Sequence, residues 1–269
     1  MLSGAARRGS EVESILRKKD LFLFDLDGVF YKGKEKREKI GGTRAIQALR
    51  RLGKKLFVLT NNSTDSVDTV HSRLAEFSIP VKKEEILTSA LLTAEYIRKE
   101  YGKATYFLIG EAGLESEMQA CGHHRTEGEK AQLVVIGLDR RLTYDRLDKA
   151  AKIVRNGASI VATHSARLYM YNDGPAIATG PIVKALEYAT QKTATVIGKP
   201  SPLMFEIALE RGGCDRREAV MVGDQLETDI EGASRAGIDS VLVMSGVDND
   251  AKGTALASIS NVDDLADLL

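Results

Sequence analysis

The sequence predicts an α/β fold with a doubly wound parallel-sheet core and a second, inserted α/β domain. Two observations support this prediction. Short runs of apolar and β-branched residues alternate with amphipathic segments along the whole chain, which is typical of parallel sheets covered by helices on both faces. In addition, the strands predicted between about residue 102 and residue 190 do not end in clusters of polar residues, whereas strands in the flanking segments do. That distribution indicates a second unit inserted into the core.

The strands and helices can be assigned in order along the chain. A short helix over ESILRKKD (13–20) leads into the first strand. The predicted strands are LFLFDLD (21–27), KLFVLTN (55–61), TYFLIG (105–110), LVVIGL (133–138), SIVATH (159–164), TATVIG (193–198), AVMVGD (219–224) and DSVLVM (239–244). The further helices are GTRAIQALRRLG (42–53), TVHSRLAEFS (69–78), RLDKAAKIVRNG (146–157), PIVKALEYAT (181–190) and PLMFEIALERGG (202–213). Several of them end in glycine, which is a common helix stop.

Composition excludes several classes of protein. The chain has 38 Lys and Arg against 38 Asp and Glu, so nothing favours a nucleic acid polymer as partner. No apolar run approaches the roughly 18–20 residues of a membrane span, and the N-terminus lacks the apolar stretch of a secretory signal. Its two cysteines, Cys121 and Cys214, lie far apart, which suggests a reduced compartment. We therefore expect a cytoplasmic protein without a membrane partner.

Four predicted strands outside the insert end in polar residues: DLDG, TNNS, GKPSP and GDQLETD. Each ending alone has an ordinary explanation, as a turn, a helix cap, a surface lysine or an acidic helix start. We expect the four strands to be neighbours in one sheet, where ligands bind beyond the carboxyl ends. The endings then form one site.

The acidic residues of that site point to a metal. Asp25, Asp27, Asp224 and Asp229 would bring four carboxylates near one point. At ~4 Å and an effective dielectric of ~20, each like-charged pair costs about 4 kcal/mol. A cation among them removes this cost, and a set of oxygen ligands without His or Cys favours Mg²⁺.

The remaining polar residues suit a phosphate. Thr60, Asn61, Asn62 and Lys199 offer hydroxyl, amide and ammonium donors to a dianion, and a helix that starts after TNNS adds free backbone N–H groups. Metal and lysine together offset charge that would otherwise repel an attacking carboxylate. These residues therefore predict phosphoryl transfer.

These motifs resemble the haloacid dehalogenase-like hydrolases, and within them the p-nitrophenyl phosphatase/NagD-type phosphatases. The similarity lies in DLDGVFY (25–31), LTNNST (59–64), GKPSPLMFEIAL (198–209) and VGDQLETDI (222–230), and it extends to EILTSA (85–90), VVIGLDRRLTYDRL (134–147) and GPIVKALE (180–187). The resemblance implies a Rossmann-like core in two parts, residues 1–101 and 191–269. It also implies a large α/β cap of the C2 type at residues 102–190, which often pairs into a homodimer.

The resemblance also implies a division of roles. Asp25 would be the nucleophile that forms an aspartyl-phosphate, and Asp27 would protonate the leaving alcohol and later deprotonate water. Thr60 and the Asn61 backbone would hold phosphate oxygens. Lys199 would pair with phosphate and nucleophile. The metal would lie between Asp25, the Asp27 backbone carbonyl, Asp224 and Asp229, the last of which would hold a metal water or orient Lys199.

The expected activity is therefore Mg²⁺-dependent hydrolysis of small phosphomonoesters. Phosphoglycolate, glycerol phosphate, pyridoxal phosphate, sugar phosphates and nucleotide monophosphates all remain open, with p-nitrophenyl phosphate as an artificial substrate. The cap loop ATHSARLYMYNDG (162–174) departs from the usual pattern, and His164, Tyr169 and Tyr171 are candidate substrate contacts there. A phosphomutase or phosphotransferase on the same core, and a non-catalytic phosphate-binding module, are the alternatives. Asp27 argues against a haloacid dehalogenase, which needs no second acid, and chain length argues against a phospho-receiver domain.

Overall fold

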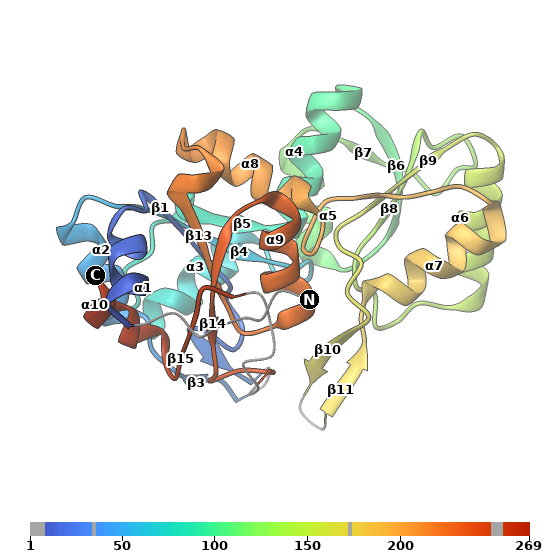
Figure 1. Cartoon of the computed structure of the whole chain (residues 1–269). Coiled ribbons are helices and arrows are strands. Elements are labelled where there is room, and N and C mark those ends of the chain that lie inside the picture. The colour runs from blue at the N-terminus through green and yellow to red at the C-terminus, as the bar shows by residue number, and fades with distance from the viewer. Residues whose placement is uncertain (1–8, 34–35, 172–173, 249–254) are drawn as a thin grey trace, which may run out of the picture. The chain divides into compact units, whose positions relative to one another are not determined.

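The computed structural model describes residues 9–33, 36–171, 174–248 and 255–269 (Figure 1). The chain divides into two compact units. The first unit comprises residues 1–60, 71–87 and 202–269, and the second comprises residues 61–70 and 88–201. All eight predicted strands are present, and they belong to two separate parallel sheets. The α/β fold class is therefore confirmed.

The first unit is built on a six-stranded sheet. Its order is β15 (Ala257–Ile259), β14 (Asp239–Val243), β13 (Ala219–Gly223), β1 (Leu21–Phe24), β4 (Lys55–Thr60) and β5 (Ile86–Thr88). The pairs β1–β13, β1–β4, β13–β14 and β14–β15 are parallel. All residues of β1 and β13 are buried, as expected for central strands covered on both faces. Figure 1 shows β14, β13, β1 and β4 side by side.

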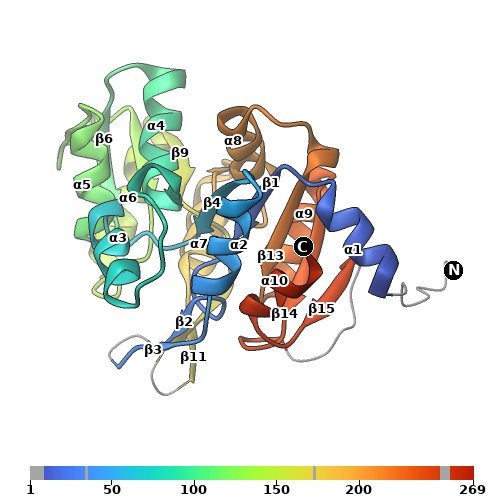
Figure 2. The same ribbon diagram turned by 90° about the vertical axis from the view of Figure 1, so that its left-hand side faces the viewer.

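Helices cover both faces of this sheet. Helices α2 (Thr43–Arg51) and α10 (Leu265–Leu268) pack together on one face, and α8 (Pro202–Gly212) and α9 (Glu231–Ala236) pack together on the other (Figure 2). Helix α1 (Gly9–Arg17) contacts α10. A short antiparallel hairpin, β2 (Tyr31–Lys32) and β3 (Glu38–Lys39), follows β1. Helix α3 (Val67–Glu76) passes from the second unit into the first.

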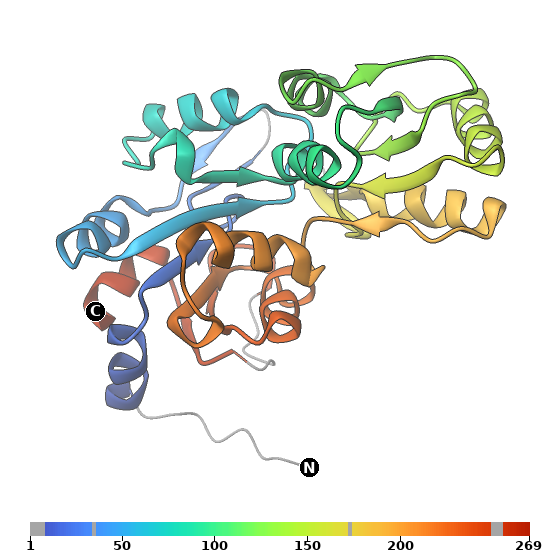
Figure 3. The ribbon, with the colours of Figure 1, turned by 90° about the horizontal axis from the view of Figure 1, so that it is seen from above.

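The second unit has its own parallel sheet in the order β12 (Thr195–Val196), β9 (Ser159–Ala162), β8 (Leu133–Ile136), β6 (Thr105–Ile109) and β7 (His124–Arg125). Helices α6 (Tyr144–Arg155) and α7 (Thr179–Thr190) cover one face, and α4 (Ser89–Tyr101) and α5 (Ala112–Ala120) lie on the other (Figures 1 and 3). Alternate residues of β6 serve the two faces: Phe107 and Ile109 join the core under α6 and α7, and Tyr106 and Leu108 point away from it.

The prediction for one strand is wrong. The sequence predicts the segment 193–198 beside the other three motif strands, but β12 pairs with β9 in the second sheet, with Thr195 opposite Val161. The reason is topological. Strand β9 and helix α7 precede β12, and a strand that follows such a crossover usually returns beside the strand it left.

A hairpin of β10 (Leu168–Tyr171) and β11 (Gly174–Ile177) completes the second unit and lies between β9 and α7. Both cysteines are free thiols, Cys121 in the second unit and Cys214 in the first. Across the described ranges of the whole chain, no helix combines the length and apolarity that a bilayer crossing requires.

Candidate active site

The two central strands of the first sheet end together and place the first two aspartates. Phe24 of β1 lies opposite Val222 of β13, and the Asp25 N–H donates to the Val222 carbonyl at 2.9 Å. Because β13 runs only one residue further, Asp224 follows at the same sheet edge. Carboxyl ends of adjacent parallel strands are where open α/β sheets bind ligands.

A third aspartate completes a group that we call the acid cluster: Asp25, Asp224 and Asp229. One carboxylate oxygen from each lies within 4.8 Å of the others, and all three residues are buried. Asp229 lies in a short π-helix (Leu226–Ile230). Its Oδ2 accepts hydrogen bonds from the Asp224 and Gln225 N–H groups, both at 3.1 Å. Among the described residues, this cluster is the one group of acidic, His or Cys ligands with metal-binding spacing.

The electrostatics of Asp224 suit a site that could bind a cation. Burial raises the pKa of Asp224 well above its ordinary value, and the charges of Asp25 and Asp229 raise it further. Its Oδ2 accepts from the Val247 N–H at 2.9 Å. Its Oδ1 is buried and has no hydrogen-bond partner among the residues described. A buried acceptor left unpaired costs free energy, so the cluster fits a hard cation with oxygen ligands, such as Mg²⁺.

Close backbone approach to Asp224 requires glycine at two positions. Gly28 has a φ of +86°, and a Cβ there would collide with the Asp224 carboxylate. A Cβ on Gly246 would collide with the same carboxylate. Gly246 belongs to the loop Ser245–Asp248 after β14, which the sequence reasoning missed. Its one available signal was its place at the end of a strand paired with β13.

Asp27 and Thr60 lie at the same edge, outside the acid cluster. The structure brings three of the four predicted carboxylates together, and Asp27 is not in that group. Asp27 is half-buried and forms a backbone bridge with Tyr31, and the Gly28 N–H donates to the Tyr31 carbonyl at 2.7 Å. Thr60 is the last residue of β4, beside β1, and is buried.

The other predicted residues belong to the second unit. The Asn61 side chain donates from Nδ2 to the Lys199 carbonyl at 2.8 Å, which joins two of the predicted motifs. Lys199 is 1% exposed. The preceding Gly198 donates its N–H to the Thr163 carbonyl at 2.7 Å, which anchors the lysine segment to the end of β9.

Asn62 organises its own loop. Its Oδ1 accepts from the backbone N–H groups of Thr64 and Asp65 at 2.9 and 3.0 Å, and its Nδ2 donates to Asp65 Oδ2 at 2.9 Å. This is the turn-forming use of asparagine. In this structure, the Asn62 side chain therefore stabilises the conformation of its loop.

His164 and the two tyrosines of the cap loop differ in setting. His164 is buried, its Nδ1 lies 3.3 Å from the donating Ala166 N–H, and its Nε2 lies 3.0 Å from Thr179 Oγ1. Burial lowers the pKa of His164 to about 4, and the positive charge of Lys199 contributes. Tyr169 and Tyr171 are half-buried on β10, with their ring centroids 6.0 Å apart in an edge-on arrangement.

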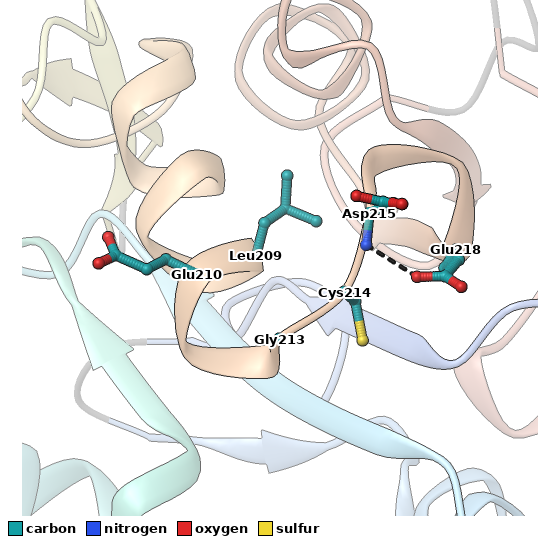
Figure 4. A pocket seen from close by; sticks show the side chains of 6 residues that line it. All are labelled: Leu209, Glu210, Gly213, Cys214, Asp215 and Glu218. Carbon is teal, nitrogen blue, oxygen red and sulfur yellow. Dashed lines mark hydrogen bonds between the residues drawn. The ribbon is translucent and has the colours of Figure 1, made fainter.

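A hollow elsewhere on the first unit is unrelated to this chemistry. Figure 4 shows its lining residues, Leu209, Glu210, Gly213, Cys214, Asp215 and Glu218. Glu218 immediately precedes β13, whereas Asp224 immediately follows that strand. The hollow therefore lies at the opposite edge of the sheet from the acid cluster.

Comparisons with known proteins agree with this geometry. A family model described as haloacid dehalogenase-like hydrolase matches residues 22–124, and a HAD-hydrolase-like model matches residues 196–268. Acid sugar phosphatases of Staphylococcus aureus and Staphylococcus epidermidis are 36% and 35% identical over 226 residues, which is 84% of this chain and 86% of theirs.

Solved structures give the same result for the fold. A 4-nitrophenylphosphatase from Thermotoga maritima has a TM-score of 0.86 at 31% identity, over 94% of this chain and 98% of that one. A p-nitrophenyl phosphatase from Archaeoglobus fulgidus has a TM-score of 0.86 at 30% identity, over 93% and 99%. This chain is a phosphomonoester hydrolase that belongs to the haloacid dehalogenase-like family, as a NagD-type phosphatase.

Proposed function

We propose that this enzyme is a Mg²⁺-dependent phosphatase that hydrolyses small phosphomonoesters through an aspartyl-phosphate on Asp25. The observation that carries the proposal is the acid cluster, with Asp224 Oδ1 buried and unpaired among the described residues. When bound by Asp25, Asp224 and Asp229, Mg²⁺ would supply positive charge against the phosphate and the attacking carboxylate. The Asp27 backbone carbonyl is a further proposed ligand.

In the first step, a carboxylate oxygen of Asp25 attacks phosphorus, and the bond to the leaving oxygen breaks. The backbone supports this role for Asp25, because its N–H is fixed to the neighbouring strand at 2.9 Å. Asp27 donates its proton to the leaving alcohol. In the second step, Asp27 removes a proton from water and the water oxygen attacks phosphorus. The bond between phosphorus and the Asp25 carboxylate oxygen breaks, which releases inorganic phosphate and regenerates Asp25.

The phosphate contacts follow from the motifs. Thr60 would donate its hydroxyl and Asn61 its backbone N–H to phosphate oxygens. Lys199 would neutralise a further negative charge. Asn62 is proposed as a residue that shapes the phosphate loop, which its hydrogen bonds to Thr64 and Asp65 support.

Sugar phosphates are the first substrates to test, because the relatives named above are acid sugar phosphatases. Phosphoglycolate, glycerol phosphate, pyridoxal phosphate and nucleotide monophosphates complete the panel.

We further propose that residues 102–190 form the inserted cap and that two copies of the chain pair through it into a homodimer. We also propose a cytoplasmic location, which the two free thiols support. Sedimentation velocity measures the oligomeric state.

The direct test is hydrolysis of p-nitrophenyl phosphate by the purified protein. We expect activity with Mg²⁺, loss in EDTA and recovery when Mg²⁺ is added back in excess. Activity that is indifferent to chelation would refute the metal assignment. With a sugar phosphate as substrate, free phosphate and free sugar in equal amounts would identify hydrolysis, whereas transfer of the phosphate to another hydroxyl of the same sugar would identify a mutase.

A further inference from the structure

The loop Ser245–Asp248 contacts three segments of the candidate active site, all within the first unit. The Ser245 hydroxyl donates to the Gly28 carbonyl at 2.9 Å, on the turn that follows Asp25 and Asp27. The Val247 N–H donates to Asp224 Oδ2 at 2.9 Å. None of the contacts depends on the second unit.

The third contact reaches the helix that carries Asp229. Asp248 Oδ2 accepts from the Leu226 N–H at 2.7 Å, at the start of the π-helix. The Asp248 N–H in turn donates to the Asp224 carbonyl at 3.2 Å. A helix N-terminus presents unpaired N–H groups, and a carboxylate is a strong partner for them. Asp248 therefore fixes both ends of the Asp224–Leu226 segment to its own loop.

We infer that this loop positions the metal ligands and determines which oxygen of Asp224 faces the ion. The Val247 N–H occupies Oδ2, so Oδ1 is left as the metal-facing atom. Gly246 allows the loop to approach, because any side chain there would collide with the Asp224 carboxylate. Asp248 and Ser245 are positioning residues: they act through the segments that bear Asp229 and Asp25, and they do not bind the metal themselves.

This inference rests on the proposed metal site, and a pair of variants separates positioning from ligation. Asp248→Asn keeps an oxygen that can accept from the Leu226 N–H, whereas Asp248→Ala removes it. Residues that orient metal ligands typically change affinity by about 10–100-fold when they are removed. We expect Asp248→Ala to raise the Mg²⁺ dissociation constant about tenfold and Asp248→Asn to change it less than about twofold. For Ser245→Ala, with one hydrogen bond lost, we expect about a fivefold increase.

The measurement is calorimetric titration of substrate-free protein with Mg²⁺, together with the melting temperature of each variant in EDTA and Mn²⁺ binding by electron paramagnetic resonance. Asp224→Ala serves as the reference without a metal site. If the wild type binds no Mg²⁺, or Asp224→Ala binds it equally well, the metal assignment of the proposed function fails.

If Mg²⁺ binding requires Asp224 but Asp248→Ala retains wild-type affinity, the metal assignment stands and the positioning role is wrong. A lower melting temperature in EDTA with unchanged affinity leads to the same conclusion, because the contact is then purely structural. If Asp248→Asn loses as much affinity as Asp248→Ala, the effect comes from the charge of Asp248 and not from its hydrogen bond to the Leu226 N–H, and the positioning role is wrong.

Discussion

The two units bury ionisable groups of opposite kind. The first unit holds the acid cluster, in which burial raises the pKa of Asp224 and two neighbouring carboxylates raise it further. The second holds His164 beside the charge of Lys199, where burial lowers the imidazole pKa to about 4. In both cases the charged form is disfavoured by burial. The two groups therefore contribute oppositely to stability: the contribution of Asp224 falls as pH rises, and that of His164 falls as pH falls.

The two sites also differ in how their side chains are satisfied. Both ring nitrogens of His164 lie at hydrogen-bond distance from protein groups. Asp224, in contrast, has one carboxylate oxygen bonded to the Val247 N–H and the other without a partner among the residues the structure describes. The neutral imidazole therefore has both of its nitrogens at hydrogen-bond distance from protein groups, whereas the acid cluster keeps a carboxylate oxygen that could bind a cation. The predictions below follow from this difference.

The largest effect is expected at Asp25, the proposed nucleophile. Asp25→Asn removes the carboxylate proposed to attack phosphorus, and an amide cannot replace it, so kcat should fall by at least about 10³-fold. The substitution also removes one negative charge from the cluster, so the fold should survive with an unchanged or higher melting temperature in EDTA. Initial rates with p-nitrophenyl phosphate and a thermal melt check both statements. Turnover close to wild type would remove Asp25 from this role.

The next effect concerns Lys199, a buried lysine of the second unit. Lys199→Met should lower kcat by about 10²–10³-fold if the ammonium stabilises charge in the transition state. It should also raise the pKa of His164, because the positive charge that disfavours the imidazolium is gone. Steady-state kinetics and an NMR titration of the imidazole measure the two effects. A normal rate in Lys199→Met would show that the ammonium serves the fold alone.

His164 should make stability fall in acid. Its folded-state pKa of about 4 lies below the ordinary value of 6.5, so between these pH values the unfolded chain binds a proton that the folded chain does not. Stability should therefore decrease as pH falls through this window, by roughly 3 kcal/mol at the low end. Urea unfolding from pH 7.5 to 4 measures it, with His164→Asn as the control that lacks this group. Parallel stability curves for the two proteins would contradict the assignment.

A smaller effect is expected where the backbone approaches Asp224. Gly246→Ala places a Cβ against the Asp224 carboxylate, which should reduce the free energy of unfolding by about 1–3 kcal/mol through overpacking. Gly9→Ala is the matched control, because a Cβ there meets nothing within 4 Å. Denaturant unfolding in EDTA compares them. Equal stability of the two variants would contradict this prediction, because it would mean that the loop moves to accommodate the added Cβ at little cost in free energy.

Much of this architecture can be predicted from sequence because it depends on local pattern. Buried parallel strands have continuous runs of apolar residues in the sequence, which predicts β1 and β13. Asp25 and Asp224 directly follow these runs, so the same pattern predicts their place at the end of the strands. The sheet that receives β12 was not predicted correctly. A two-residue strand has little pattern of its own, and its partner is decided by the crossover that precedes it.

The loop after β14 shows a second limit. Its contacts with the acid cluster use a backbone N–H and the absence of a side chain at Gly246. Neither feature distinguishes a functional loop from an ordinary turn in a sequence. The hairpin β10–β11 was likewise expected as a loop, because Tyr169 and Tyr171 alternate with exposed apolar residues instead of with polar ones.

The central claim is that the acid cluster is built for a cation, and Asp224→Asn tests it most directly. The measurement is the melting temperature of wild type and variant at pH 7.5, in EDTA and with saturating Mg²⁺. In EDTA the variant should melt about 2–4 °C higher, since it removes a buried charge that its neighbours repel, worth about 1 kcal/mol. Mg²⁺ should stabilise the wild type by about 2.7 kcal/mol at a hundredfold excess over its dissociation constant, and should not stabilise the variant. A variant that melts lower in EDTA, or that keeps the full Mg²⁺ shift, would contradict the account.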